Sequence, residues 1–229
     1  MFRCVLFDLD GTLVDSLESI AVAGNKALLE VGLPPQPVKA YQYFAGDGAD
    51  TLVKRALIAA GDEACTLYDK AYSVYKHFFL QGSTYHVAPF AGILDVLNAL
   101  KNNKIKIGVI SNKPHLATVE VVESLFGAGY FDYVIGHKEG GKKKPDPSIT
   151  REAANALGVK PAECMYVGDT NVDMENGLKA GMFTVGVLWG FRELEELKAC
   201  RPHAIIAYPG ELLQYVVTKG EANVICEDK

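Results

Sequence analysis

The sequence lacks the features that mark secreted, membrane-spanning and nucleic-acid-binding proteins. Its five cysteines are odd in number, widely spaced and without a C-x-x-C pair, so they favour a reducing compartment over a disulfide framework. No apolar run approaches the ~20 residues that a membrane span needs. Asp8 and Asp10 interrupt the apolar stretch near the N-terminus, which leaves no signal-peptide pattern. We therefore expect a cytoplasmic protein that does not enter a membrane.

An excess of basic residues is also missing. The 23 lysines and arginines are outnumbered by 28 aspartates and glutamates, which gives a formal net charge of −5. This charge argues against general nucleic-acid binding. Hydrophobic residues make up 49% of the 229 residues, enough for a full core in one large domain or two small ones.

The first informative feature is a short apolar stretch, residues 4–7, which is followed by two carboxylates, Asp8 and Asp10. The stretch predicts a strand buried on both faces, as in a parallel sheet. Asp8 and Asp10 lie two residues apart, so in extended backbone their side chains point to the same side, where their charges repel unless a cation lies between them. Gly11 then allows a sharp turn. An ordinary turn is the alternative, since Asp and Gly are common turn residues.

Strand and helix patterns alternate from residue 89 onwards. Strands are expected at residues 105–110, 133–136, 165–167, 183–188 and 204–207. Helices are expected at residues 92–102, 114–126, 147–157, 173–180 and 209–217. This alternation predicts an α/β fold with a doubly wound parallel sheet.

The segment between the first strand and this alternation has helical patterns and no strand pattern. Helical periodicity covers residues 17–31, 51–60 and 63–80. The third helix is rich in aromatic residues, which we interpret as a helix-packing stripe rather than a ligand cage: Tyr68, Tyr72, Tyr75, Phe78 and Phe79. We therefore expect a helical insertion directly after the first strand.

Polar residues follow three of the predicted strands: Asp8, Ser111 and Asp169. In open α/β sheets, ligands bind at the carboxyl ends of the strands. Ser111 offers a hydroxyl and backbone N–H groups to an anion, although a helix N-cap is an equal alternative. Asp169 and Asp173 lie four residues apart at a helix start, where acids also occur without a further role.

Lys144 is the last of three lysines before a predicted helix. A lysine run is usually a solvated surface, but at a helix start Lys144 could aim a point charge at a phosphate. Four carboxylates, a hydroxyl and a lysine around one sheet edge together describe a site for Mg²⁺ and phosphate.

Four short motifs carry these residues: DLDGT with DS at residues 8–12 and 15–16, SNK at 111–113, KPDP at 144–147 and GDTNVD at 168–173. Each is weak alone, but the ordered set spans most of the chain and resembles the haloacid dehalogenase superfamily, in its phosphatase branch. The segments GDGAD at 46–50 and GVLWGF at 186–191 resemble the phosphoglycolate phosphatases within it. The resemblance implies a Rossmann-like core at residues 1–16 and 86–229, with a small α-helical cap domain at residues 17–85.

The resemblance also implies roles for the site residues. Asp8 would be the nucleophile that forms an aspartyl-phosphate, and Asp10 the general acid and base. Mg²⁺ would be the cofactor, held by Asp8, by the backbone carbonyl of Asp10 and by Asp169, with Asp173 orienting the site from outside. The implied phosphate-binding residues are Ser111, Asn112, Lys144 and Thr12. For Thr12, support of its loop is the alternative; the role of Lys113 is left open, and it too could only support its loop.

Substrate choice would fall to the cap, because the core motifs recognise only a phosphoryl group and Mg²⁺. Gly46 and Gly48 form the expected substrate loop, and the helix that follows has a free N-terminus that favours an anion. Asp47 and Asp50 carry charges that oppose an anion there, and the alternative is that they cap the helix. Through the resemblance we expect a small carboxylate-bearing phosphate monoester as the partner, with 2-phosphoglycolate first.

Other activities stay open at this point. A sugar phosphomutase of the same superfamily is one alternative, although mutases usually carry Glu-Asp where this chain has Gly168 and Asp169. A phosphatase of sugar phosphates or nucleotides is another. Haloacid dehalogenases and phosphonoacetaldehyde hydrolases usually lack the second acid, Asp10. A non-catalytic phosphate-binding protein would bind Mg²⁺ without turnover. The chain is expected to be a monomer or a homodimer.

Overall fold

A six-stranded parallel sheet forms the centre of the computed structural model, which describes residues 2–216. Its strands are β1 (Cys4–Phe7), β4 (Lys106–Pro114), β5 (Tyr133–His137), β6 (Cys164–Gly168), β7 (Phe183–Val187) and β8 (Ala204–Ile206). They lie in the order β5-β4-β1-β6-β7-β8, so the chain builds the sheet outward on both sides of β1. The predicted doubly wound α/β fold is confirmed.

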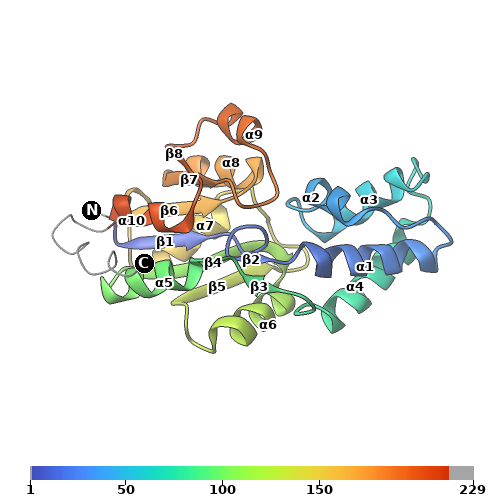
Figure 1. Cartoon of the computed structure of the whole chain (residues 1–229), viewed down its shortest axis with the longest axis horizontal. Helices are drawn as coiled ribbons and strands as arrows, with labels where there is room; N and C mark the ends of the chain where they lie inside the picture. The colour runs from blue at the N-terminus through green and yellow to red at the C-terminus, as the bar shows by residue number, and fades with distance from the viewer. Residues whose placement is uncertain (1, 217–229) are drawn as a thin grey trace, which may run out of the picture.

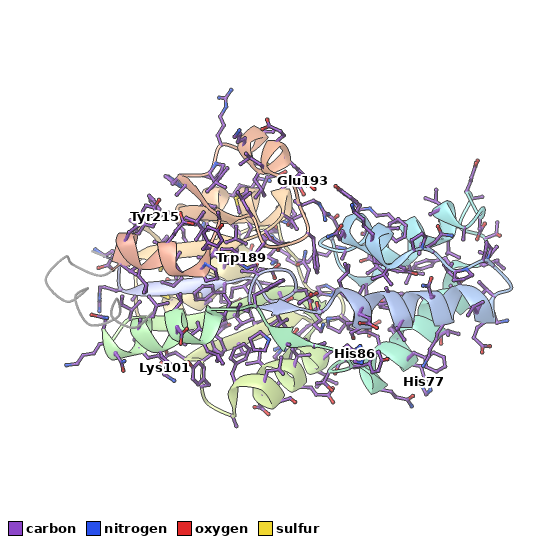
Figure 2. All side chains as sticks on the ribbon, viewed as in Figure 1. His77, His86, Lys101, Trp189, Glu193 and Tyr215 are labelled. Carbon is purple, nitrogen blue, oxygen red and sulfur yellow. The ribbon has the colours of Figure 1, made fainter. Side chains whose placement is uncertain are left out.

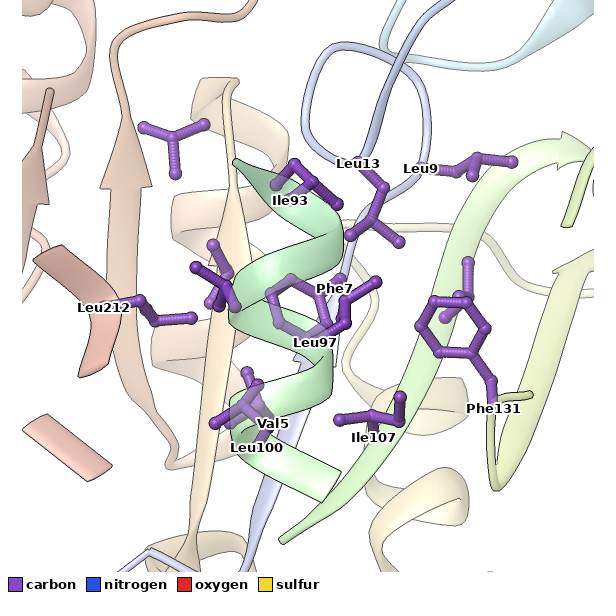
Figure 3. Close-up of a cluster of buried hydrophobic side chains, with 14 of the residues drawn as sticks. Val5, Phe7, Leu9, Leu13, Ile93, Leu97, Leu100, Ile107, Phe131 and Leu212 are labelled. Atoms are coloured by element: carbon purple, nitrogen blue, oxygen red, sulfur yellow. The ribbon is translucent and has the colours of Figure 1, made fainter. Parts of the chain in front are cut away.

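Helices cover both faces of this sheet because successive β1 side chains point to opposite faces and all of them are apolar. Val5 and Phe7 pack in one hydrophobic cluster with α5 (Ile93–Asn102), α6 (His115–Phe126) and α10 (Leu213–Val216), and Figure 3 shows α5 lying across them. Cys4 and Leu6 pack in a second cluster with α7 (Ser148–Ala156) and α8 (Asn171–Ala180). The burial of both faces explains why β1 lacks polar alternation.

A helical insert follows β1, as predicted. It contains α1 (Leu17–Glu30), a 3₁₀ helix (Val38–Ala40), α2 (Tyr41–Phe44), α3 (Ala49–Ala59) and α4 (Tyr68–Gln81). We call helices α1–α4 the cap; they lie beyond the carboxyl ends of the sheet strands (Figure 1). Their hydrophobic cluster also includes Ala117 and Phe191 from the sheet-containing part, so the two parts pack together. The domain limits at residues 16/17 and 85/86 stay predictions.

Two short strands join the parts at their junction. β2 (Val14–Asp15) pairs antiparallel with β3 (Ala88–Pro89), so the chain enters and leaves the cap side by side. The pair was not predicted because two residues carry no readable alternation. The short helix α9 (Leu194–Ala199) was also missed, because a helix of less than two turns shows no readable periodicity.

Two predicted boundaries differ from the structure. The helix expected at 63–80 begins at Tyr68, because the Asp62 carboxylate accepts hydrogen bonds from the N–H groups of Thr66 and Leu67 and so holds the preceding residues in a turn. The strand expected to end at residue 110 continues to Pro114, which pairs with His137 after an irregularity.

The last segment is described only in part. A 3₁₀ helix (Pro209–Leu212) leads into α10, and the rest of the predicted helix at 209–217, the tail and Cys226 lie outside the described residues. Within residues 2–216, Cys4, Cys65, Cys164 and Cys200 are free. No helix in this part of the chain is long and apolar enough to span a membrane.

Candidate active site

The carboxyl ends of three neighbouring strands place the predicted polar residues together. Asp8 follows β1 directly, Ser111 lies near the end of β4, and Asp169 follows β6. Strands β4 and β6 are the two neighbours of β1, so these side chains meet where the strand order reverses. The N–H of Asp8 donates to the carbonyl of Val167 at 2.9 Å, which continues the β1–β6 pairing up to the site.

Three buried carboxylates form the deepest part of the site. Asp8, Asp169 and Asp173 each offer an oxygen, and these oxygens lie within 4.8 Å of one another. Burial, followed by the charge of Asp173, raises the pKa of Asp169 to about 7. Burial and the charge of Asp173 also raise the pKa of Asp8 well above its usual range, against the opposing effect of Lys144. A buried set of oxygen donors with this excess negative charge suits a hard divalent cation such as Mg²⁺.

Lys144 lies among these carboxylates rather than on a solvated face. Its Nζ is 2.7 Å from Asp8 Oδ1 and 2.8 Å from Asp173 Oδ1. Burial alone would lower the pKa of Lys144, but the carboxylates of Asp173 and Asp8 outweigh it and raise that pKa well above the usual value. The ammonium group therefore stays charged beside the nucleophile candidate.

Asp173 is tied to its surroundings on both oxygens. Besides Lys144, it accepts hydrogen bonds from the hydroxyl of Tyr166 at 3.2 Å and from the hydroxyl of Thr170 at 2.7 Å. Thr170 is also the N-cap of α8, so the helix start fixes the carboxylate. This arrangement suits the orienting role expected for Asp173.

Thr12 contacts the carboxylate cluster. Its side chain is fully buried, and its hydroxyl donates to Asp169 Oδ1 at 3.0 Å, so it supports a carboxylate instead of facing a phosphate. The N–H of Phe191 donates to the other oxygen, Asp169 Oδ2, at 2.8 Å. Trp189, near the centre of Figure 2, fixes the same turn because its ring N–H donates to the Thr12 carbonyl at 2.9 Å. Of the two roles foreseen for Thr12, loop support fits the contacts.

Glycines permit the close approach around Asp169. A Cβ at Gly11 would overlap the Asp169 carboxylate, and one at Gly190 would overlap both Asp169 and the Gly11 carbonyl. Gly11 also has a positive φ of 85°, which favours glycine. The turn after Asp10 and the loop after β7 are therefore built around one carboxylate.

Asp10 lies outside the carboxylate cluster and has its own partners. Its Oδ1 accepts from Lys113 Nζ at 2.8 Å and from Ser16 Oγ at 2.6 Å. The Lys113 side chain is 1% exposed and lies over the Phe79 ring at 4.6 Å. The sequence suggested for Lys113 no more than support of its loop, and the pairing with Asp10 was missed. The available signal was its spacing of two residues from Ser111, which places both side chains on one side of an extended segment.

Ser111 and Asn112, near the end of β4, line the site on the same sheet edge as Asp8 and Asp10. The Ser111 hydroxyl accepts from the N–H of Lys113 at 3.1 Å, which leaves its proton for an acceptor in the cavity. The Asn112 side chain accepts from the N–H of Lys144 at 2.8 Å and donates to the carbonyls of Lys144 and Gly46, both at 3.0 Å. It thereby links the loop of Lys144 to the cap.

Both acidic residues of the cap loop form ion pairs with basic side chains. Asp47 lies 2.6 Å from Arg55, and Asp50 lies 2.7 Å from Lys143. Neither acid is the N-cap of α3, which is Gly48, but Asp50 lies in the first turn, where, against the effect of burial, Lys143 and bonds from the backbone N–H groups of Thr51 and Asp50 lower its pKa. Gly46 and Gly48 have φ values of 110° and 93°, and both line the cavity. Their glycine identity is explained by these φ values.

Arg192 also links the cap to the sheet-containing part. It was missed by the sequence analysis. Its guanidinium donates to the carbonyls of Gln42 and Ala45 at the end of α2, the latter at 3.0 Å, and its Nε bonds to Glu196 at 3.0 Å. The residue is 6% exposed. Together with the Asn112–Gly46 bond, these contacts hold the cap over the carboxylates.

A cavity of about 50 Å³ lies between the two parts. Asp8, Asp10 and Ser111 line it from the sheet edge. Mostly apolar cap residues line it from the other side: Ile20, Ala45, Gly46, Gly48, Ala49, Leu52, Tyr75 and Phe79. The aromatic stripe of α4 thus packs the cap, as predicted, and also contributes two side chains to the cavity wall. The cavity therefore has carboxylates and a hydroxyl on one side and a mostly apolar wall on the other.

Comparisons with known proteins agree with this geometry. Residues 5–187 match the family of haloacid dehalogenase-like hydrolases. The chain is 32% identical to a phosphoglycolate phosphatase of Aquifex aeolicus over 212 residues, covering 93% of this chain and 95% of the relative. It is 31% identical to the phosphoglycolate phosphatase of Pseudomonas putida over 207 residues, covering 89% and 76%.

A solved structure adds the similarity of fold. The crystal structure of a putative phosphoglycolate phosphatase from Lactobacillus delbrueckii superposes with a TM-score of 0.86 at 28% identity, covering 94% of this chain and 98% of the other. The family match extends from β1 to β7 and so includes the cap, the carboxylate cluster and Lys144. The chain belongs to the family of haloacid dehalogenase-like hydrolases.

Proposed function

We propose that this protein is a Mg²⁺-dependent phosphatase of small carboxylate-bearing phosphate monoesters, with 2-phosphoglycolate as the first candidate. The proposal rests mainly on the cavity, which has Asp8 and Asp10 on one wall and the cap loop on the other. The similarity to phosphoglycolate phosphatases supports the same substrate.

The reaction would pass through an aspartyl-phosphate on Asp8. An oxygen of Asp8 attacks phosphorus while the bond to the leaving oxygen breaks, and Asp10 gives that oxygen a proton. Asp10 then takes a proton from a water molecule, which attacks the phosphorus and releases Asp8 and inorganic phosphate. Lys144 and the free hydroxyl proton of Ser111 would hold the phosphoryl oxygens.

The donor set of the cluster fits a bound Mg²⁺. Asp8 and Asp169 would hold it together with the backbone carbonyl of Asp10, and Asp173 would orient the cluster through Lys144 and Thr170. Bound there, the ion would neutralise the negative charge that separates Asp8 from a phosphate dianion.

Recognition of the substrate carboxylate would fall to the cap loop. The α3 N-terminus begins at Gly48, and the Asp47–Arg55 and Asp50–Lys143 pairs remove the charge repulsion that opposed an anion there. Free N–H groups of a helix N-terminus favour a carboxylate.

The backbone after β6 disfavours the mutase alternative. A side chain at Gly168 would overlap Asp173, so the Glu-Asp pair typical of the mutases does not fit this backbone.

Turnover of a phosphate monoester panel, with Mg²⁺ and with EDTA, tests the proposal. We expect Mg²⁺-dependent release of phosphate with the highest kcat/KM for 2-phosphoglycolate. Preference for sugar phosphates or nucleotides would refute the substrate assignment, and Mg²⁺ binding without turnover of any monoester would indicate a non-catalytic phosphate-binding protein.

A further inference from the structure

Three tyrosines are buried in the described part of the chain, and one of them differs from the other two. The hydroxyl of Tyr41 bonds to Asn25 at 3.0 Å, and that of Tyr166 bonds to Asp173 at 3.2 Å. Tyr75 is 2% exposed, yet within residues 2–216 its hydroxyl has no hydrogen-bond partner. A buried hydroxyl usually has a partner, so this oxygen calls for an explanation.

The Tyr75 hydroxyl is in contact with the cavity. Among the described residues, no side-chain oxygen that is sealed from solvent lacks a hydrogen bond, so the unpaired Tyr75 oxygen must border open space. The open space that Tyr75 lines is the cavity that holds Asp8 and Asp10. Its ring is fixed there because it stacks on Phe79, with ring centroids 5.1 Å apart.

The position of Tyr75 assigns it to the leaving-group end of the cavity. The groups suited to the phosphoryl oxygens, Ser111 and Lys144, belong to the sheet edge, whereas Tyr75 comes from α4 of the cap. The neighbouring cap residues, Ile20 and Leu52, are apolar and offer a ligand no hydrogen bond. Burial, followed by the charge of Asp10, raises the pKa of Tyr75 well above its usual value, so the hydroxyl stays protonated and can donate.

We propose that the Tyr75 hydroxyl determines specificity by donating a hydrogen bond to an acceptor oxygen on the leaving group, here a carboxylate oxygen of the substrate. This inference rests on the proposed function and refines it, because it requires a leaving group with an acceptor oxygen a few atoms from phosphorus. A simple alkyl phosphate would leave the hydroxyl unpaired beside an apolar group, which costs binding free energy.

The experiment compares two substrates of similar size on two proteins. The substrates are 2-phosphoglycolate and ethyl phosphate, which carries a methyl group in place of the carboxylate. The variant is Tyr75→Phe, which keeps the ring and its stacking on Phe79. Tyr72→Phe is the matched control: it lies on the same helix and is not among the residues that line the cavity.

We expect Tyr75→Phe to lose about 10–100-fold in kcat/KM on 2-phosphoglycolate, mainly through KM, as for one hydrogen bond to a charged group. On ethyl phosphate it should stay within about 2-fold of the parent, since the acceptor is absent there. Inhibition by inorganic phosphate, which has no leaving group, should be unchanged, and Tyr72→Phe should match the parent throughout.

Other outcomes overturn the inference in distinguishable ways. An equal loss on both substrates, or no loss on either, would refute the role of Tyr75 and leave the phosphatase assignment standing. A parent enzyme that hydrolyses ethyl phosphate as well as 2-phosphoglycolate would refute recognition of the carboxylate. If the parent turns over neither compound, the proposed function fails and this inference fails with it.

Discussion

Replacement of Lys113 by methionine tests whether the Lys113–Asp10 pair serves catalysis. Methionine keeps an unbranched apolar stem against the Phe79 ring but removes the ammonium group that lies 2.8 Å from Asp10 Oδ1. Asp10 then keeps the bond from Ser16 and loses the one that fixes it from the β4 side. The fold should survive, since one buried cation is replaced by a side chain of similar length.

The expected loss of kcat follows from the burial of the Lys113–Asp10 pair. The side chains of Lys113 and Asp10 are 1% and 16% exposed, so solvent screens their interaction only weakly. A hydrogen bond to a charged group contributes about 1.5–3 kcal/mol, which corresponds to roughly 10–150-fold in kcat if the bond holds Asp10 in place for proton transfer. The Mg²⁺ affinity should stay within about 2-fold, because the Asp10 carboxylate lies outside the Asp8–Asp169–Asp173 cluster.

The assay is steady-state turnover of 2-phosphoglycolate with a Mg²⁺ titration, on single and double variants. In an Asp10→Asn background, Lys113→Met should cause less than about 2-fold further loss, because residues that act as a unit are not additive. Lys142→Met, which removes an exposed lysine paired with Asp146, is the control. Full activity in Lys113→Met, or a loss confined to Mg²⁺ affinity, would refute the reasoning.

Three further predictions concern the metal cluster and the cap. Gly190→Ala should push Asp169 aside and lower Mg²⁺ affinity by about 10–100-fold in calorimetry, and unchanged binding would contradict the packing argument. Arg192→Gln should raise KM by about 10-fold or more, because it loses its bonds to the carbonyls of Gln42 and Ala45; an unchanged KM would show that they do not hold the cap closed. Burial raises the pKa of Asp169 from 3.8 to about 7, so the folded protein binds this proton more tightly than the unfolded chain does. The free energy of unfolding without metal should therefore fall as the pH rises from about 4 to about 7. Mg²⁺ should therefore raise the melting temperature more at pH 8 than at pH 5.5, and a pH-independent rise would be the contrary result.

The sequence predicted the sheet and the strand-end residues because both follow from local patterns. An apolar stretch that ends in Asp8, Ser111 or Asp169 needs no knowledge of the rest of the chain, and parallel pairing brings the three strand ends together. The helical insert was readable for the same reason, from its periodicity and from the lack of strand patterns.

The contacts between distant segments could not be predicted from local sequence patterns. The Lys113–Asp10 pair joins residues 103 positions apart, and the bond from Arg192 to the Ala45 carbonyl joins residues 147 apart, so neither has a local signature. Thr12 shows the opposite case, because a motif residue was expected at the phosphate while its hydroxyl is used by Asp169. The role proposed for Tyr75 depends on a hydroxyl that has no hydrogen-bond partner within residues 2–216, which only three-dimensional contacts reveal.

The central claim is that Asp8 carries the phosphoryl group during turnover. Acid quenching of the enzyme during turnover of 2-phosphoglycolate with Mg²⁺, followed by peptide mass spectrometry, tests it directly. The account predicts one phosphoryl group on the peptide that contains Asp8, sensitive to hydroxylamine, and neither phosphorylation nor turnover in Asp8→Asn. A phosphoryl group on another residue, or sustained turnover by Asp8→Asn, would contradict the account.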